Sequence, residues 1–186
     1  RAAAILRERP QEFAELITLE MGKLLREARG EVALAASILK YYGEQGPGFL
    51  EPRTIPVPQG EATVLHAPLG VLLGIEPWNY PLYQVVAKVI PAIAAGCTVV
   101  LKPAPDTPWC AALVGKVVAE ETDFPPGVLN IVTSTDHQLG AQLSTDPRVD
   151  LVSFTGSTAT GKKVMAAASE SLKKVFLELG GKSAFI

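Results

Sequence analysis

The chain has 186 residues, of which 48% are hydrophobic and 19% are charged, so it can bury a substantial core and predicts one globular domain or slightly more. A net charge of −2 provides no basic surface for nucleic acid, and no apolar run approaches the roughly 18 residues of a membrane span. We therefore expect a cytoplasmic protein with neither nucleic acid nor membrane as a partner.

The first 62 residues divide into a helical part and a proline-rich part. Residues 1–45 carry apolar side chains at spacings of three and four, which predicts two or three amphipathic helices, and Pro10 is expected to open the second. Residues 46–62 are rich in proline and glycine and are predicted to be an extended connector. Helical spacing starts at the first residues and KSAFI, residues 182–186, stops inside an expected strand, so we expect a fragment.

From residue 63 onward, short β-branched runs alternate with helical ones. Strands without a polar face, separated by helices, predict a parallel sheet covered on both faces, which is a doubly wound α/β domain over residues 63–186. Such sheets bind ligands at the carboxyl ends of their strands. The strand-like runs are TVLHA, GVLLGI, TVVLK, VLNIV, VDLVSF and KKVFLEL, and helices are expected at residues 81–95, 107–121, 136–144 and 158–171.

Three polar residues follow expected strands, and each has a structural and a functional interpretation. Asn79 in WNYP either satisfies a turn or donates its amide to an oxyanion. Lys102 follows TVVL and is either a surface lysine or a ligand-binding cation at the end of the sheet. Glu178 precedes two glycines and is a candidate general base.

Residues 156–163, GSTATGKK, nearly match the phosphate-binding loop G-x-x-x-x-G-K-[ST]. Lys163 stands where a hydroxyl should hold Mg²⁺, which disfavours a P-loop NTPase. A strand, a glycine turn and a helix N-terminus remain the expected local structure, and such a turn binds phosphate in other contexts too.

The cysteines and histidines form no metal or redox motif. Cys97 and Cys110 lie outside any C-x-x-C pattern and away from a histidine. We interpret both as buried small hydrophobic residues, and His66 and His137 as non-catalytic. No metal site is expected.

Together these stretches resemble the aldehyde dehydrogenase superfamily, in the order and spacing of that family and over nearly the whole chain. The matching segments are LEMGK (19–23), REARGEV (26–32), PLGVLLGIEPWNYP (68–81), IPAIAAGCTVVLKPAPDTP (90–108), FPPGVLNIV (124–132), VSFTGSTATGK (152–162) and LELGGKSAFI (177–186).

The resemblance implies a Rossmann-like dinucleotide-binding domain and a role for each matching residue. Asn79 would hold the tetrahedral oxyanion, and Glu178 would activate water against a thioester. The residues implied to contact or line the cofactor site are Pro77, Trp78, Lys102, Pro105, Gly156, Ser157, Thr160, Leu179 and Gly180.

The implied reaction is the NAD(P)-dependent oxidation of a small aldehyde to a carboxylic acid through a cysteine thioester. In this family the nucleophilic cysteine lies in a separate catalytic domain some tens of residues beyond the glutamate, and neither Cys97 nor Cys110 matches it. We therefore expect the 186-residue chain to be inactive alone. A non-catalytic dinucleotide-binding module is the remaining alternative.

The resemblance also bears on cofactor, substrate and assembly. Pro105 stands where many NAD-preferring members have a glutamate that repels a 2′-phosphate, so NAD is the expected cofactor and NADP also fits. GIEPWNYPLYQ and ILKYYGE resemble succinate-semialdehyde dehydrogenases. A homodimer or homotetramer is expected at full length, formed through an arm outside the dinucleotide domain.

Overall fold

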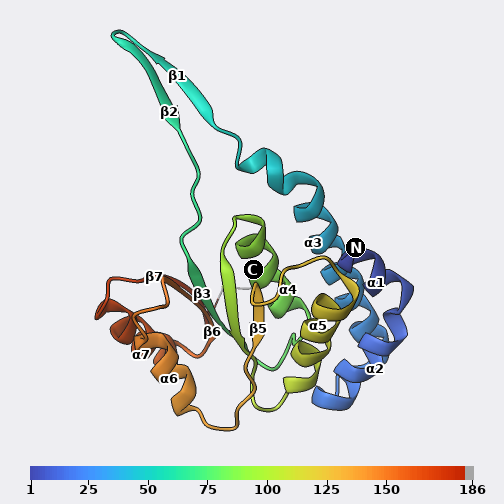
Figure 1. Ribbon diagram of the computed structural model, residues 1–186. Coiled ribbons are helices and arrows are strands. Elements are labelled where there is room, and N and C mark those ends of the chain that lie inside the picture. The colour runs from blue at the N-terminus through green and yellow to red at the C-terminus, as the bar shows by residue number, and fades with distance from the viewer. Residues whose placement is uncertain (183–186) are drawn as a thin grey trace.

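The computed structural model describes residues 1–182, and most of the strand expected at KSAFI lies outside them (Figure 1). Three helices begin the chain: α1 (Ala2–Glu8), α2 (Pro10–Met21) and α3 (Leu25–Phe49). Pro10 opens α2 as predicted, and Gly22 ends it in the left-handed conformation. The N-terminal helices are confirmed, although α3 continues beyond the expected limit at residue 45.

The prediction of an extended connector over residues 46–62 was wrong in its local structure. This stretch holds the last turn of α3 and most of a hairpin, in which β1 (Arg53–Val57) pairs antiparallel with β2 (Gly60–Val64). A proline in an edge strand needs no partner for its missing N–H, and Pro58 presets the backbone of the turn. TVLHA therefore contributes to this projecting hairpin and not to the parallel sheet (Figure 1).

Five parallel strands form the central sheet in the order β5-β4-β3-β6-β7. The chain moves outward from β3 to β5 and then returns to the other side of β3, which confirms the predicted doubly wound topology. The strands are β3 (Val71–Ile75), β4 (Thr98–Lys102), β5 (Leu129–Ile131), β6 (Leu151–Gly156) and β7 (Lys174–Leu179). The helices between them are α4 (Tyr83–Ala94), α5 (Pro108–Glu121), α6 (Gln138–Thr145) and α7 (Thr158–Ser169).

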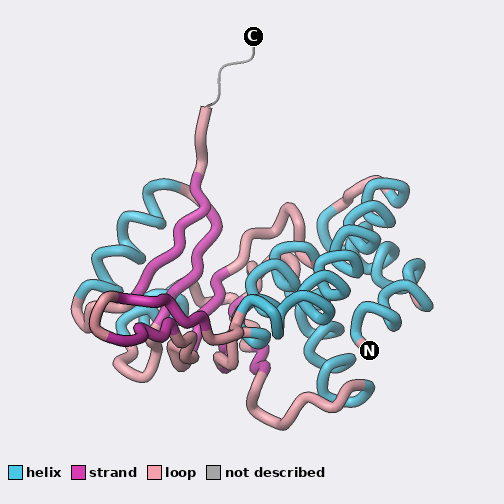
Figure 2. Tube along the Cα trace, turned by 90° about the horizontal axis from the view of Figure 1, so that it is seen from above, coloured by secondary structure: helices cyan, strands magenta, loops and turns pink. Residues whose placement is uncertain are grey.

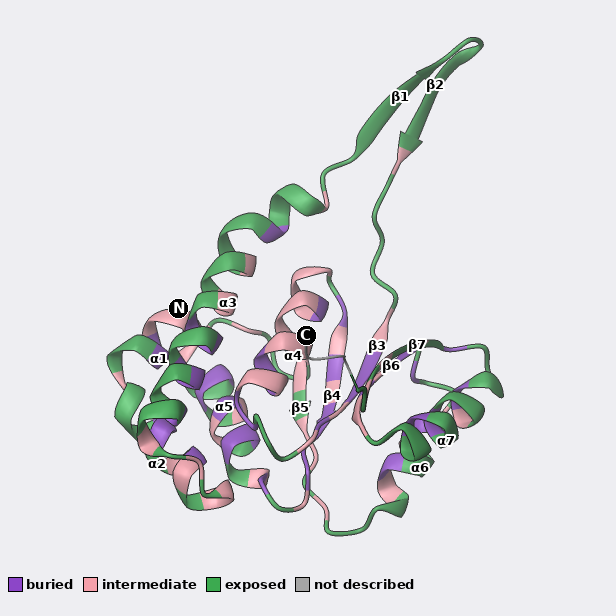
Figure 3. Ribbon diagram, turned by 180° about the vertical axis from the view of Figure 1, so that it is seen from behind, coloured by how far each residue is buried: buried purple, intermediate pink, exposed green. Residues whose placement is uncertain are grey.

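The helices cover the sheet unequally. Figure 2 shows α6 and α7 on one side of the strands and the larger group of helices on the other. Alternate residues of a strand point to opposite faces, so Leu72 joins the large core under α1 to α5 whereas Leu73 joins the smaller core under α6 and α7. Figure 3 shows buried residues concentrated on these inner surfaces, with the hairpin exposed.

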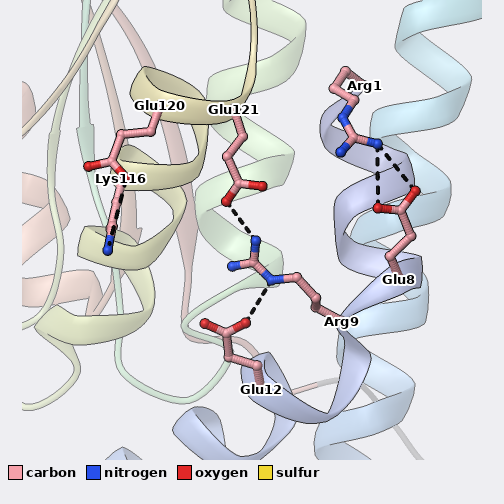
Figure 4. Close-up of polar contacts among 7 residues, drawn as sticks. All are labelled: Arg1, Glu8, Arg9, Glu12, Lys116, Glu120 and Glu121. Atoms are coloured by element: carbon pink, nitrogen blue, oxygen red, sulfur yellow. Dashed lines mark hydrogen bonds and ion pairs between the residues drawn. The ribbon is translucent and has the colours of Figure 1, made fainter.

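Polar contacts attach the N-terminal helices to α5. The guanidinium of Arg9, between α1 and α2, lies 2.7 Å from the Glu12 carboxylate and 2.6 Å from that of Glu121 at the end of α5 (Figure 4). Glu20 accepts hydrogen bonds from the amides of Trp109 and Cys110 at the start of α5. The helical region is therefore packed against the sheet domain as one body. Across residues 1–182, none of the helices combines the length and apolarity needed to cross a bilayer.

Candidate functional site

The parallel register brings the predicted site residues to one edge of the sheet. Ile75 pairs with Lys102 on one side and with Phe154 on the other, and Thr155 pairs with Glu178. The loops that follow β3, β4, β6 and β7 consequently leave the sheet at the same edge. This is the edge at which doubly wound domains bind ligands.

The turn between β3 and α4 carries Asn79, which is exposed beside the exposed Trp78. Its backbone carbonyl accepts a 2.9 Å hydrogen bond from the ammonium of Lys23, which also lies 3.7 Å above the Tyr80 ring. Lys23 is paired in turn with the carboxylate of Glu31 at 2.5 Å. The turn is therefore attached to the N-terminal helices by charged groups.

Glu31 also fastens the start of α4. One of its carboxylate oxygens accepts hydrogen bonds from the amides of Leu82 at 2.9 Å and Tyr83 at 3.0 Å. These amides lie at the N-terminus of a helix, where the macrodipole favours a negative charge. The Glu31 side chain is fully buried, so all three of its polar contacts are made away from solvent.

A second buried ion pair lies beneath the same turn. The ammonium of Lys88 on α4 lies 3.0 Å from a Glu76 oxygen and donates to Gln84 at 3.1 Å and Thr155 at 2.7 Å. Burial raises the pKa of Glu76, and the nearby charge and hydrogen bond of Lys88 offset this in part. The other Glu76 oxygen is buried without a hydrogen bond from the described residues. The base of the turn is consequently polar as well as buried.

Glu178 lies near the end of β7, in an open cleft of about 480 Å³ between β6, β7 and the first turns of α4. Its carboxylate shares this face with Thr155, which is bonded to Lys88. An exposed carboxylate in such a cleft can reach water and a bound ligand. The residues that line the cleft are Tyr83, Gln84, Lys88, Ser153, Phe154, Thr155, Phe176, Leu177 and Glu178.

The GSTATG segment forms a strand end, a tight turn and a helix start, as predicted. Ser157 caps α7 by accepting a 3.2 Å hydrogen bond from the amide of Thr160, and its hydroxyl also donates to that of Thr160 at 2.9 Å. Gly161 is buried against Leu179, where an added Cβ would lie 2.5 Å from a methyl group. The glycine thus lets α7 pack closely on β7, and Leu179 is held beneath the turn.

Two further features of this turn suit a phosphate. Its helix has 12 residues, and its first turn is exposed at the ligand-binding edge of the sheet. Gly180, just after β7, is exposed nearby, with its carbonyl 3.5 Å from the Thr158 hydroxyl. An exposed helix N-terminus after a glycine turn fits the pyrophosphate of a dinucleotide.

Lys102 ends β4 and is only 4% exposed, so it is not a surface lysine. Burial lowers its pKa, and the negative charge of Asp136 counteracts this in part. Its ammonium lies 3.4 Å from the Pro103 carbonyl. Pro105, half-buried in the following loop, has no side-chain charge with which to repel a second anion. A buried cation at the strand end fits the ribose or phosphate side of a nucleotide.

Both cysteines are free and buried, which confirms their interpretation as small core residues. Burial, with a contribution from Glu20, raises the pKa of the Cys110 thiol. A thiol with a raised pKa is a poor nucleophile at neutral pH. No group of three or more metal-binding side chains occurs among residues 1–182.

Sequence reasoning missed four charged residues around the Asn79 turn: Lys23, Glu31, Glu76 and Lys88. One signal was present, because Glu31 occupies a position of the apolar stripe of α3, between Ala28 and Ala35, where a charge is unexpected. Glu76 likewise follows directly on the apolar strand β3. A charge at an apolar position indicates a buried partner.

Comparison with known sequences gives a match over the whole chain. The sequence model of the aldehyde dehydrogenase family matches residues 1–186. The chain is 56% identical over 186 residues to a succinate-semialdehyde dehydrogenase [NADP(+)] of Deinococcus radiodurans, covering all of this chain and 39% of that protein. It is 47% identical to the mitochondrial succinate-semialdehyde dehydrogenase of Arabidopsis thaliana, covering 92% of this chain and 32% of that protein.

Solved structures give the same result. The succinic semialdehyde dehydrogenase of Streptococcus pyogenes in complex with NADP⁺ superposes with a TM-score of 0.93 at 36% identity, over 99% of this chain and 40% of that one. An NAD-dependent aldehyde dehydrogenase of Sinorhizobium meliloti gives a TM-score of 0.91 at 38% identity, over 97% and 36% of the two chains. The chain thus spans about two fifths of the length of these proteins.

Proposed function

The chain belongs to the aldehyde dehydrogenase family, and we propose that it supplies the cofactor site, the oxyanion donor and the general base of an enzyme that oxidises an aldehyde to a carboxylic acid. The observation that carries the proposal is the placement of Asn79, Glu178 and the N-terminus of α7 along the ligand-binding edge of one sheet. Neither cysteine of the chain is suited to act as the nucleophile, because both are buried and burial raises the pKa of the Cys110 thiol. The chain alone is therefore expected to bind cofactor without turnover.

The two polar residues have separate tasks in this proposal. The Asn79 side-chain amide donates to the oxyanion that forms when a thiolate adds to the aldehyde. Glu178 takes a proton from the water that hydrolyses the thioester, which its exposure in the cleft permits. A dinucleotide held at the start of α7 would supply the hydride acceptor that this oxidation needs.

The proposed cofactor contacts rest on two features that fit a dinucleotide: the exposed N-terminus of α7 and the buried ammonium of Lys102. Gly156, Ser157 and Thr160 at the start of α7 would hold the pyrophosphate, and Lys102 would bind the adenosine ribose. Pro77, Trp78, Leu179 and Gly180 would line the remainder of the groove. NAD is the expected cofactor, and NADP also fits because Pro105 brings no carboxylate to this position. Relatives named for NADP and for NAD both occur.

Similarity to named relatives bears on the substrate, and the shape of the hairpin bears on the assembly. Relatives named as succinate-semialdehyde dehydrogenases support a small semialdehyde as the substrate class. The hairpin of β1 and β2 projects from the body with nine of its ten strand residues exposed, which suits an arm that pairs subunits into a dimer or tetramer. A cytoplasmic location remains a prediction.

Cofactor binding can be tested on the chain itself. Titration with NADH and NADPH, followed by their fluorescence, is expected to show saturable binding that needs no Mg²⁺. Lys102→Met is expected to weaken binding about tenfold, the equivalent of losing roughly 1.4 kcal/mol. Lys116→Met on the outer face of α5 is the matched control and leaves binding unchanged. Binding of ATP that requires Mg²⁺ would instead support the P-loop alternative.

The catalytic roles require a nucleophile, which a chimera provides. Residues 1–186 replace the matching span of the Deinococcus radiodurans relative, and oxidation of succinate semialdehyde is measured. Asn79→Ala is expected to lower kcat by roughly 10²–10³-fold, the usual cost of losing an oxyanion donor. Glu178→Gln is expected to slow thioester hydrolysis. Full activity of both variants would show that residues 1–186 contribute no catalytic group and act as a non-catalytic dinucleotide-binding module.

A further inference from the structure

Lys23 is a nearly buried lysine for which the proposed chemistry provides no role. Its side chain is 9% exposed, although it lies in the short loop between α2 and α3 where solvent access is usual. Its ammonium meets three groups: the Glu31 carboxylate, the Asn79 carbonyl and the face of the Tyr80 ring. Two of the three belong to the turn that carries the proposed oxyanion donor.

We propose that Lys23 and Glu31 are positioning residues for Asn79. Lys23 fixes the peptide that follows Asn79, and Glu31 fixes the amides of Leu82 and Tyr83 where α4 begins. The backbone of the turn is thus held on both sides of position 80. This inference rests on the proposed role of Asn79 as an oxyanion donor.

The physical need for such a clamp follows from exposure. Asn79 is exposed, so its amide is oriented chiefly by the backbone that carries it. A displacement of about 1 Å at a reacting centre can cost on the order of 10²-fold in rate. A backbone carbonyl bonded to an ammonium gives stronger restraint than a neutral hydrogen bond would. Clamping the backbone therefore protects the geometry of the oxyanion site.

The charges themselves favour a specific role over simple packing. Replacing a buried ion pair by well-packed apolar residues is often neutral or stabilising, so stability alone does not require Lys23 and Glu31. An apolar pair at these positions would leave the Asn79 carbonyl and the two α4 amides without these partners. The charged pair is thus suited to holding the backbone of the turn in place, and not only to joining helices.

Trp78 provides a reporter beside Asn79. The chain has two tryptophans, so Trp109→Phe leaves Trp78 as the only one, exposed in the turn. The key variant combines Lys23→Met with Glu31→Gln, which removes both charges and keeps a side-chain oxygen to accept from the α4 amides. Circular dichroism and thermal unfolding establish that it is folded. Lys23→Arg preserves the charge, and Lys40→Met on the exposed face of α3 is the control.

The proposal predicts faster acrylamide quenching and lower anisotropy of Trp78 in the double variant. Lys23→Arg, which preserves the charge, is expected to show smaller changes in both quantities, and Lys40→Met is expected to match the parent. In the chimeric enzyme the double variant is expected to lose about 10- to 100-fold in kcat, with the KM for NAD(P) nearly unchanged.

Three results would overturn the proposal in distinguishable ways. Unchanged quenching and anisotropy of Trp78 in the folded double variant would show that the turn needs no clamp, whatever Asn79→Ala does to activity. A looser turn with unchanged kcat would make the pair purely structural. Full activity of Asn79→Ala would reject the proposed oxyanion role and the positioning role that depends on it.

Discussion

The turn that carries Asn79 and the strand that carries Glu178 are supported in opposite ways. The turn is attached to the N-terminal helices through Lys23 and Glu31, and a second ion pair lies beneath it. Glu178 instead lies on β7, an edge strand of the described sheet, whose residue Phe176 is 64% exposed on the same face. Rigidity at one half of the candidate site is thus built from distant sequence, whereas the other half lies on an edge strand that packs against α6 and α7 on one face and is open on the face that carries Glu178.

The largest effect is expected at Glu31, which supports the turn that carries Asn79. Glu31→Ala leaves Lys23 buried without its counter-ion and the α4 amides without an acceptor, so we expect a loss of about 3–5 kcal/mol in the free energy of unfolding. Urea titration followed by circular dichroism measures it. Glu27→Ala, one turn earlier on the exposed face of α3, is the control and should change stability by less than about 0.5 kcal/mol. Similar small losses in both variants would refute a clamp.

A smaller, pH-dependent effect is expected at Glu76. Burial raises the pKa of this carboxyl above its ordinary value of 4.5, so the folded chain binds the proton more tightly than the unfolded chain does. Its contribution to stability is therefore fully present below pH 4.5 and is lost as the pH rises through the raised pKa of the folded state. Glu76→Gln removes this titration.

The measurement compares the unfolding free energy of the parent and of Glu76→Gln across this pH range. The parent is expected to lose stability relative to the variant as the pH rises above 4.5. Glu44→Gln, at an exposed position of α3, should track the parent at every pH. A difference between parent and Glu76→Gln that does not change with pH would show that Glu76 titrates normally.

The position of the candidate site at one edge of the sheet was more predictable from sequence than the contacts that support the Asn79 turn. The strands β3, β4 and β6 are largely apolar runs that need no distant information, and the helices begin with local signals such as Pro108 in α5 and the cap Ser157 in α7. Parallel topology then places Asn79, Lys102 and Glu178 at one edge. That argument uses only chain order and strand direction.

The clamp and the hairpin were not predictable in the same way. Lys23 meets the Asn79 carbonyl across 56 residues of sequence, so the contact exists only after α2 and α3 pack against α4. Taken singly, Pro56 and Pro58 predict a break in structure, although they are compatible with an exposed two-stranded hairpin. In both places the outcome depends on a partner segment that local patterns do not identify.

The smallest effect is expected on the open face of β7. Phe176→Thr exchanges an exposed aromatic residue for another residue that favours strands, so stability should change by no more than about 0.5 kcal/mol. Leu177→Thr on the same strand is the matched comparison. Leu177 packs against the core under α6 and α7, and its loss should cost several times more.

Self-association separates the two variants further. An exposed apolar residue on an edge strand promotes pairing between chains, so we expect the sedimentation coefficient of the parent to rise with concentration and Phe176→Thr to reduce that rise. Leu177→Thr should leave that increase intact or enlarge it, since it weakens the fold without removing the exposed ring. A loss of more than about 1 kcal/mol on Phe176→Thr would mean that this side chain already has a packing partner. The cleft around Glu178 would then be as firmly supported as the turn of Asn79, and the contrast between them would be lost.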